Sequence, residues 1–102
     1  MEIQCDPIYA KVDRLLDILT KSKSLHILLI LHKASDSLSF GEIKSRVDSS
    51  GTTVSRRLNE IEEFGLVKRE ISKSKSISYE LTKKSESLAP VIQSMYDWCL
   101  TN

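Results

Sequence analysis

The chain has few of the residues that build covalent frameworks, metal centres or phosphate-binding loops. Its two cysteines, Cys5 and Cys99, are too few and too far apart for a disulfide framework or a zinc site. Its three glycines form no glycine-rich loop, and no nucleophile motif or paired-carboxylate element is present in the sequence. The sequence therefore predicts no catalytic residue, no metal site and no cofactor, and it argues against an enzyme.

Long apolar runs are also missing. The longest stretch, residues 27–31, is far too short to cross a bilayer. Residues 1–6 lack a basic segment followed by an apolar run, so we expect no signal peptide. These absences predict a soluble cytoplasmic protein without a membrane partner.

The chain as a whole has almost no net charge, but its charged residues are unevenly distributed along the sequence. The formal net charge is only +1. Residues 66–84 nevertheless hold two acids, Glu70 and Glu80, against the basic residues Lys68, Arg69, Lys73, Lys75, Lys83 and Lys84. This local excess fits a phosphate-facing patch, and it fits a solvated hairpin equally well.

Apolar residues, by contrast, are plentiful: they make up 40% of 102 residues, enough for one core of ordinary size. Helical and strand periodicity, polar breaks and capping residues divide the chain into elements. We expect helices at 7–19, about 25–34, from Ser39 to Val47, about 52–64 and about 83–100, with strands at 38–40, 66–71 and 77–82. This order predicts a mainly α protein with a small β-hairpin (α+β), a single winged helix-turn-helix domain over 1–102.

The fourth expected helix carries side chains that suit contact with DNA. Val54, Leu58 and Ile61 form its core stripe, which leaves the other faces exposed. Hydroxyl, Arg and Asn side chains gather near its start and acids near its end, opposite to the order that the helix dipole favours. It suits a recognition helix over about 51–64 in the major groove. The predicted DNA-binding residues are Ser50, Gly51, Thr52, Thr53, Ser55, Arg56, Arg57 and Asn59.

Basic residues outside this helix are candidates for phosphate contacts. The hairpin tip at 72–76 would form the wing, with Lys73 and Lys75 on the DNA backbone or in the minor groove. Lys44 and Arg46, on the exposed side of the third helix, are further candidates. Each of these residues fits the role of an ordinary surface residue equally well.

Several of these segments resemble a known family of regulators. Two of them look like the helix-turn-helix core of the MarR and ArsR superfamily, residues 40–43 and 54–67. Four more are similar to its HxlR branch, residues 5–7, 79–82, 88–91 and 96–98. The resemblance implies a homodimeric transcriptional regulator that binds double-stranded DNA. It also implies that the first and last helices, within 1–22 and 83–102, form the subunit interface.

The last helix is too broadly apolar for one small core, so its surplus apolar surface agrees with a subunit interface. A two-fold dimer would in turn imply a palindromic operator. The predicted interface residues are Ile8, Val12, Leu88, Val91, Ile92, Met95, Trp98 and Cys99. Some members of the branch use an N-terminal cysteine to sense oxidants, so the resemblance makes Cys5 a candidate redox residue. A plain reduced thiol is the alternative. A redox or small-molecule effector stays open.

Two further interpretations complete the expectations. His26 and His32 are six residues apart, which does not place them on one helix face as ligands, so we interpret them as core or boundary residues. The alternative to a DNA-binding regulator is a winged-helix protein-interaction module within a transcription complex. Apolar or acidic side chains in place of Thr52, Thr53 and Arg56 would favour that alternative.

Overall fold

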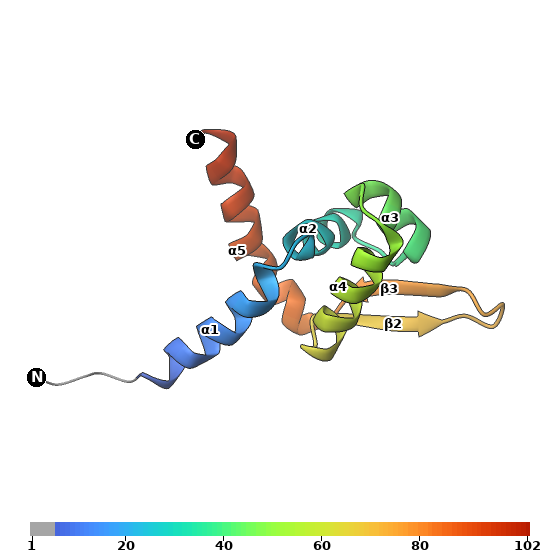
Figure 1. The fold of residues 1–102 in the computed structure, drawn as a ribbon, viewed down its shortest axis with the longest axis horizontal. Coiled ribbons are helices and arrows are strands. Elements are labelled where there is room, and N and C mark those ends of the chain that lie inside the picture. Colours follow the sequence, from blue (N-terminus) through green and yellow to red (C-terminus); the bar gives the residue numbers. More distant parts are fainter. Residues whose placement is uncertain (1–5) are drawn as a thin grey trace, which may run out of the picture.

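The computed structural model describes residues 6–102, which form five helices and three strands (Figure 1). The helices are α1 (Pro7–Leu19), α2 (Ser24–Ala34), α3 (Phe40–Val47), α4 (Gly51–Glu63) and α5 (Lys83–Leu100). The strands are β1 (Leu38–Ser39), β2 (Val67–Ile71) and β3 (Ile77–Leu81). The predicted mainly α fold with a small hairpin is confirmed.

Short polar side chains fix where the helices begin. Asp6 caps α1 by accepting a hydrogen bond from the Ile8 N–H at 2.9 Å, with Pro7 at the first helical position. At α3, the Ser39 Oγ accepts from the Glu42 N–H at 3.2 Å, and the Ser39 N–H donates to Glu42 Oε1 at 3.0 Å. This is the predicted capping box. It satisfies amide groups that have no partner inside the helix.

The core is centred on α2, where Ile27, Leu28 and Leu31 are buried. It continues into α3, α4 and the sheet through Ile43, Val47, Val54, Leu58, Ile61, Leu66, Val67 and Tyr79. An apolar helix with almost no polar face belongs at such a centre. The prediction of a central second helix is confirmed.

The three strands form an antiparallel sheet in the order β1-β3-β2. Leu38 of β1 lies opposite Tyr79 of β3, and Val67 of β2 lies opposite Leu81 of β3. The β2-β3 hairpin extends past the helices, so that its tip stands free of the core (Figure 1). This projection is the wing of the winged-helix fold.

Two segments leave the core in the other direction. In Figure 1, α1 and the C-terminal half of α5 diverge from the point where they meet α2, and neither covers the other. The molecule measures 61 × 32 × 24 Å as a result. Within residues 6–102, no helix is long and apolar enough to cross a membrane.

Candidate nucleic-acid interface

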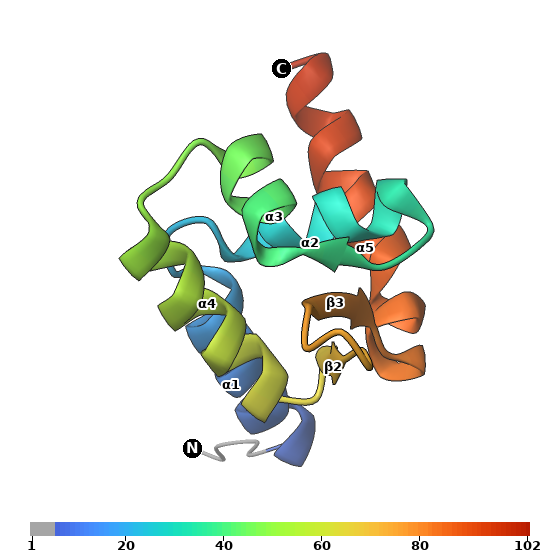
Figure 2. The same ribbon diagram turned by 90° about the vertical axis from the view of Figure 1, so that its right-hand side faces the viewer.

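The helix-turn-helix consists of α3, a three-residue turn and α4. Asp48 ends α3 in the left-handed conformation with φ 50°, and this reverses the chain direction. Ser50 then caps α4, because its Oγ accepts from the Thr53 N–H at 3.2 Å. Figure 2 looks along the wing and shows α4 beside it on the same side of the molecule. The turn thus leads from α3 into the start of α4, and the end of α4 leads into the wing (Figure 2).

The exposed side of α4 carries uncharged polar residues and one arginine. Thr52, Ser55, Arg56 and Asn59 are all exposed, as predicted. They line a shallow groove of about 750 Å³, together with Phe40 of α3 and the acids Glu60 and Glu63 near the end of α4. Hydrogen-bonding side chains therefore line this surface from Thr52 to Asn59, and the negative charges follow in the last turn of α4.

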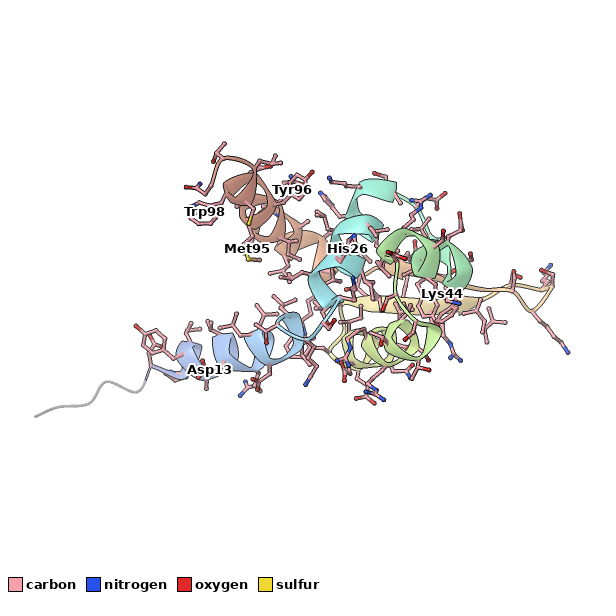
Figure 3. All side chains as sticks on the ribbon, turned by 45° about the horizontal axis from the view of Figure 1, so that its top comes forward. Asp13, His26, Lys44, Met95, Tyr96 and Trp98 are labelled. Atoms are coloured by element: carbon pink, nitrogen blue, oxygen red, sulfur yellow. The ribbon has the colours of Figure 1, made fainter. Side chains whose placement is uncertain are left out.

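Two of the predicted contact residues, Ser50 and Thr53, already bond to each other at the start of α4. The Ser50 hydroxyl donates to Thr53 Oγ1 at 3.1 Å, and Thr53 is half-buried. A Cβ on Gly51 would lie 3.8 Å from the Lys44 side chain, which passes beside this end of α4 (Figure 3). These residues shape the helix start, where Ser50 satisfies the Thr53 amide.

Arg57 is a correction to the sequence prediction, which placed it on the exposed side. It is only 9% exposed. Arg57 is three residues from Val54 and four from Ile61, so the helical repeat puts it on the core-facing stripe. Its guanidinium donates to Glu60 Oε1 at 2.7 Å, and this ion pair offsets the cost of burying the charge. Arg57 is therefore removed from the candidate DNA-contact residues.

The wing ends in a polar turn with two exposed lysines, Lys73 and Lys75. The turn is closed by a hydrogen bond from the Lys75 N–H to the Ser72 carbonyl at 2.9 Å, and Lys75 has φ 65°. Further down the hairpin, Lys68 lies 3.2 Å from Glu80 and 3.6 Å from Glu70. The hydrogen bond and charge of Glu80, followed by the charge of Glu70, raise the Lys68 pKa. Lys68 is thus occupied by carboxylates, whereas the two tip lysines are open to solvent.

The basic residues of 66–84 do not form one patch. Lys73 and Lys75 are at the tip of the hairpin, whereas Lys83 and Lys84 follow β3 at its base, where α5 begins. Lys84 donates to the Phe64 carbonyl at 2.8 Å and stands over the Phe64 ring. The local charge excess in the sequence therefore divides between the tip and the base of the hairpin.

Besides the two acids, one further groove residue was not among the predicted contacts. Phe40 is half-buried at the first position of α3 and lines the groove beside Thr52 and Arg56. In the sequence, Phe40 continues the apolar spacing of Ile43 and Val47, so it carries only the signal of a core residue. Its role in shaping the groove follows from how α3 packs against α4.

The histidines and cysteines lie elsewhere. His26 and His32 are both exposed, so the prediction of core or boundary positions was wrong. Between residues 6 and 102, no group of three His, Cys, Asp or Glu residues is arranged to hold a metal ion. Cys5 is outside the described residues, and its redox role remains a prediction. Cys99 is exposed on α5.

The predicted dimer-interface residues divide into exposed and buried sets. The exposed members are Ile8 and Val12 of α1 and Val91, Met95, Trp98 and Cys99 of α5. Figure 3 shows Trp98 on the side of α5 away from α2 and Tyr96 on the side near α2. Ile92 is only 5% exposed and Leu88 is half-buried; both pack on the protomer's own core. The assignment of Ile92 to a partner surface was therefore wrong, because α2 already covers that face.

With this geometry described, comparison with known proteins is decisive. The sequence model of the HxlR-like helix-turn-helix family matches residues 19–102. The chain belongs to this family. The HxlR-like regulator is 33% identical over 91 residues to the uncharacterized HTH-type transcriptional regulator YvaP of Bacillus subtilis, a match that covers 86% of this chain and 82% of YvaP.

Solved structures agree with the family. The reduced form of the transcriptional regulator YodB from B. subtilis has a TM-score of 0.77 and 25% identity, covering 94% of this chain and 91% of YodB. A possible HxlR family transcriptional factor from Thermoplasma volcanium has a TM-score of 0.68 and 29% identity, covering 82% of this chain and 80% of that one. The HxlR-like regulator therefore has the winged-helix fold of DNA-binding transcription regulators.

Proposed function

We propose that this protein regulates transcription by binding double-stranded DNA in a sequence-specific manner, with α4 in the major groove and the 72–76 wing on the backbone or minor groove. One observation carries the proposal: the exposed start of α4 bears Thr52, Ser55, Arg56 and Asn59, and the acids follow at its other end. Arg and Asn side chains reach base edges, and short hydroxyl side chains let the backbone come close. Glu60 and Glu63, near the end of α4, would then be kept away from the negatively charged phosphates of the DNA.

The wing and α3 would add affinity without adding sequence specificity. Lys73 and Lys75 are exposed at the tip of the wing, and Lys44 and Arg46 are exposed on α3. Lysine and arginine side chains that bind phosphates release counterions, so binding should weaken steeply with salt. Replacing one phosphate-binding side chain by a neutral one should reduce the log–log salt slope by about 0.9.

The exposed arms support a homodimer. Trp98 of α5 and Tyr9 of α1 are 65% and 66% exposed, and Ile8, Val12 and Val91 extend the same apolar surfaces. An apolar groove of about 420 Å³ between α2 and α5 adds to this area. Apolar surfaces of this kind mark contact sites, and identical subunits usually pair about a two-fold axis. Such a dimer would hold two recognition helices about 34 Å apart, which suits a palindromic operator.

Operator binding is tested with the Arg56→Ala variant. After selection from random oligonucleotides, we expect this variant to bind the enriched site more weakly by about 1–3 kcal/mol, because the arginine's hydrogen bonds to a base edge or a phosphate are removed. Fluorescence anisotropy at several salt concentrations measures the change. Arg14→Ala removes another exposed arginine, which is on α1 and does not line the groove, and should bind as the wild type does. Full binding by Arg56→Ala would contradict the proposed orientation of α4.

The dimer is tested with Met95→Asp. Met95 is 40% exposed on α5, so the carboxylate should leave the protomer folded while opposing association. Analytical ultracentrifugation should give monomers, and circular dichroism should give an unchanged helix content. A dimer that persists in this variant would refute the proposed interface. Ile92→Asp is unsuitable for the test, because it places a charge in the core.

A protein-interaction module is the second candidate, and the surface of α4 discriminates against it. The exposed start of α4 offers Thr52, Ser55 and Arg56 rather than an apolar or acidic surface. No enrichment of any duplex sequence at low salt would favour this alternative over the proposed regulator.

A further inference from the structure

Helix α4 places one acid within reach of both of its arginines. Glu60 lines the same groove as Arg56, and it follows Arg56 by four residues and Arg57 by three. Side chains three or four residues apart are neighbours on a helix surface, so the Glu60 carboxylate can pair with either guanidinium. The two arginines therefore compete for one carboxylate.

In the structure, the carboxylate pairs with the buried arginine. Arg57 Nη1 donates to Glu60 Oε1 at 2.7 Å, a short charge-assisted hydrogen bond. The other ion pairs among residues 6–102 are those of Lys68, so Arg56 takes part in none of them. The exposed Arg56 guanidinium is therefore free to bind another group, although an acid lies one helical turn away.

Burial explains this choice of partner. The Arg57 side chain is 11% exposed and that of Glu60 27%, so water screens their attraction less than it would screen a pair with the exposed Arg56. Arg57 Nε is buried and has no hydrogen-bond partner in this part of the chain. If Arg57 also lost Glu60, its buried charge would be uncompensated, which is costly. The carboxylate is therefore held on the Arg57 side of α4.

We propose that Arg57 is a positioning residue of the DNA interface, because it holds Glu60 and so keeps Arg56 free for DNA. Without Arg57, the Glu60 carboxylate would pair with Arg56 and occupy donors that a base edge or a phosphate requires. Arg57 does not line the groove and contacts no DNA in this arrangement. The proposal rests on the proposed function, in which Arg56 binds the operator.

Two double variants of equal net charge test the proposal. Arg57→Met removes the ion pair and places an unbranched apolar side chain in a buried site, and either Glu60→Gln or Glu63→Gln is added to it. Glu63 also lines the groove, but it is two helical turns from Arg56, about 10 Å along the axis. Fluorescence anisotropy with the selected operator measures the affinity of each variant.

We expect Arg57→Met to bind the operator about fivefold more weakly, the upper value of one exposed ion pair that DNA must break. Adding Glu60→Gln should restore binding to within about twofold of the wild type, whereas adding Glu63→Gln should not. Arg57→Lys keeps a cation beside Glu60 and should bind nearly as the wild type does. Equal affinities of the two double variants would overturn the proposal, because a general loss of structure or of charge does not distinguish Glu60 from Glu63.

Glu60→Gln alone gives a test that does not depend on the folding of Arg57→Met. In the wild type the carboxylate is already held by Arg57, so this variant should bind the operator within about twofold of the wild type. A gain of about fivefold would mean that Glu60 already occupies Arg56 in the wild type, which contradicts the proposal.

Side-chain NMR of the free protein separates this proposal from the proposed function. The Arg56 Nε–H should exchange rapidly with water in the wild type, more slowly in Arg57→Met, and rapidly again when Glu60→Gln is added, because an ion pair protects the proton. The same exchange rate in all three proteins would contradict the role of Arg57. The expected changes in a protein that binds no selected duplex would contradict only the proposed function.

Discussion

Apolar side chains meet two different environments in this protein. In the helix-turn-helix core, Ile27 of α2, Ile43 of α3 and Leu58 of α4 are 0% exposed. In the arms, Tyr9 of α1 and Trp98 of α5 keep about two thirds of their surface in contact with solvent. The helices of the core therefore bury their apolar side chains within the protomer, whereas the two arms leave theirs in contact with solvent.

This difference shows which helices can bury their apolar surface within a single protomer. Apolar surface stabilises a fold by about 25 cal/mol for each Å² removed from water, so residues left exposed contribute little. Helices α2, α3 and α4 bury their stripes against each other and the sheet, and this region holds the proposed recognition helix in place. The arms gain comparable stabilisation only against another surface, which is why we propose that they form the subunit interface.

The largest expected change in stability comes from a substitution in the core, and it tests the difference between the core and the arms directly. Leu58→Ala should lower the free energy of unfolding by about 2–5 kcal/mol, because it leaves a cavity in a fully buried site. Trp98→Ala removes a larger side chain but should change the stability of the dilute monomer by no more than about 0.5 kcal/mol. Urea denaturation at low protein concentration measures both. If the two losses were equal, α5 would be packed within the protomer and the distinction would fail.

An intermediate effect concerns the junction between the two regions. Gly65 follows α4 with φ 86°, and its N–H donates to the Glu62 carbonyl while the Leu66 N–H donates to the Ile61 carbonyl. Gly65→Ala should lower the free energy of unfolding by about 1–2 kcal/mol, because a side chain is strained in this left-handed conformation.

Gly41→Ala is the matched control for that substitution. Gly41 is inside α3, and a Cβ there would meet nothing within 4 Å. Alanine is the better helix former, so this variant should gain about 0.5–1 kcal/mol. Thermal unfolding of the two variants should therefore shift in opposite directions; a shared direction would argue against the backbone explanation.

The smallest expected effect is a pH dependence of the free energy of unfolding, caused by Glu42 in the capping box of α3. Hydrogen bonds from Ser39, first from its backbone N–H and then from its side chain, lower the Glu42 pKa, with a further contribution from the Arg46 charge. Because the Glu42 pKa is lower in the folded state than its ordinary value of 4.5, the ionised carboxylate stabilises the fold at any pH above 4.5. This stabilisation is lost as the pH falls through the lowered folded-state pKa.

Glu42→Gln isolates this contribution, because the amide can still accept from the Ser39 N–H but does not titrate. Between pH 6 and acid conditions (about pH 3), the wild type should lose slightly more stability than the variant. Denaturation at each pH measures the difference. Parallel stability curves would show that the capping-box carboxylate is not linked to folding.

Much of this structure could be predicted from residues that act locally. The cap at Asp6, the capping box at Ser39 and Glu42, and the stop at Gly65 each depend on neighbours a few positions away, so their effect is visible in the sequence. Arg57 and the two histidines could not be assigned in this way. A charged residue type suggests solvent, but Arg57 is on the core-facing stripe and has Glu60 as its partner.

The sequence by itself determined the order of helices and strands, their caps and the polar character of the α4 surface, since these follow from short-range periodicity and hydrogen bonding. The tertiary structure alone decided that Ile92 is buried in the core while Met95 and Trp98 stay exposed. It also separated Lys73 at the wing tip from Lys84 at the end of α4, and brought Lys84 together with Arg14 in one cleft. Such groupings join residues far apart in the chain, and only the packing of whole elements sets those distances.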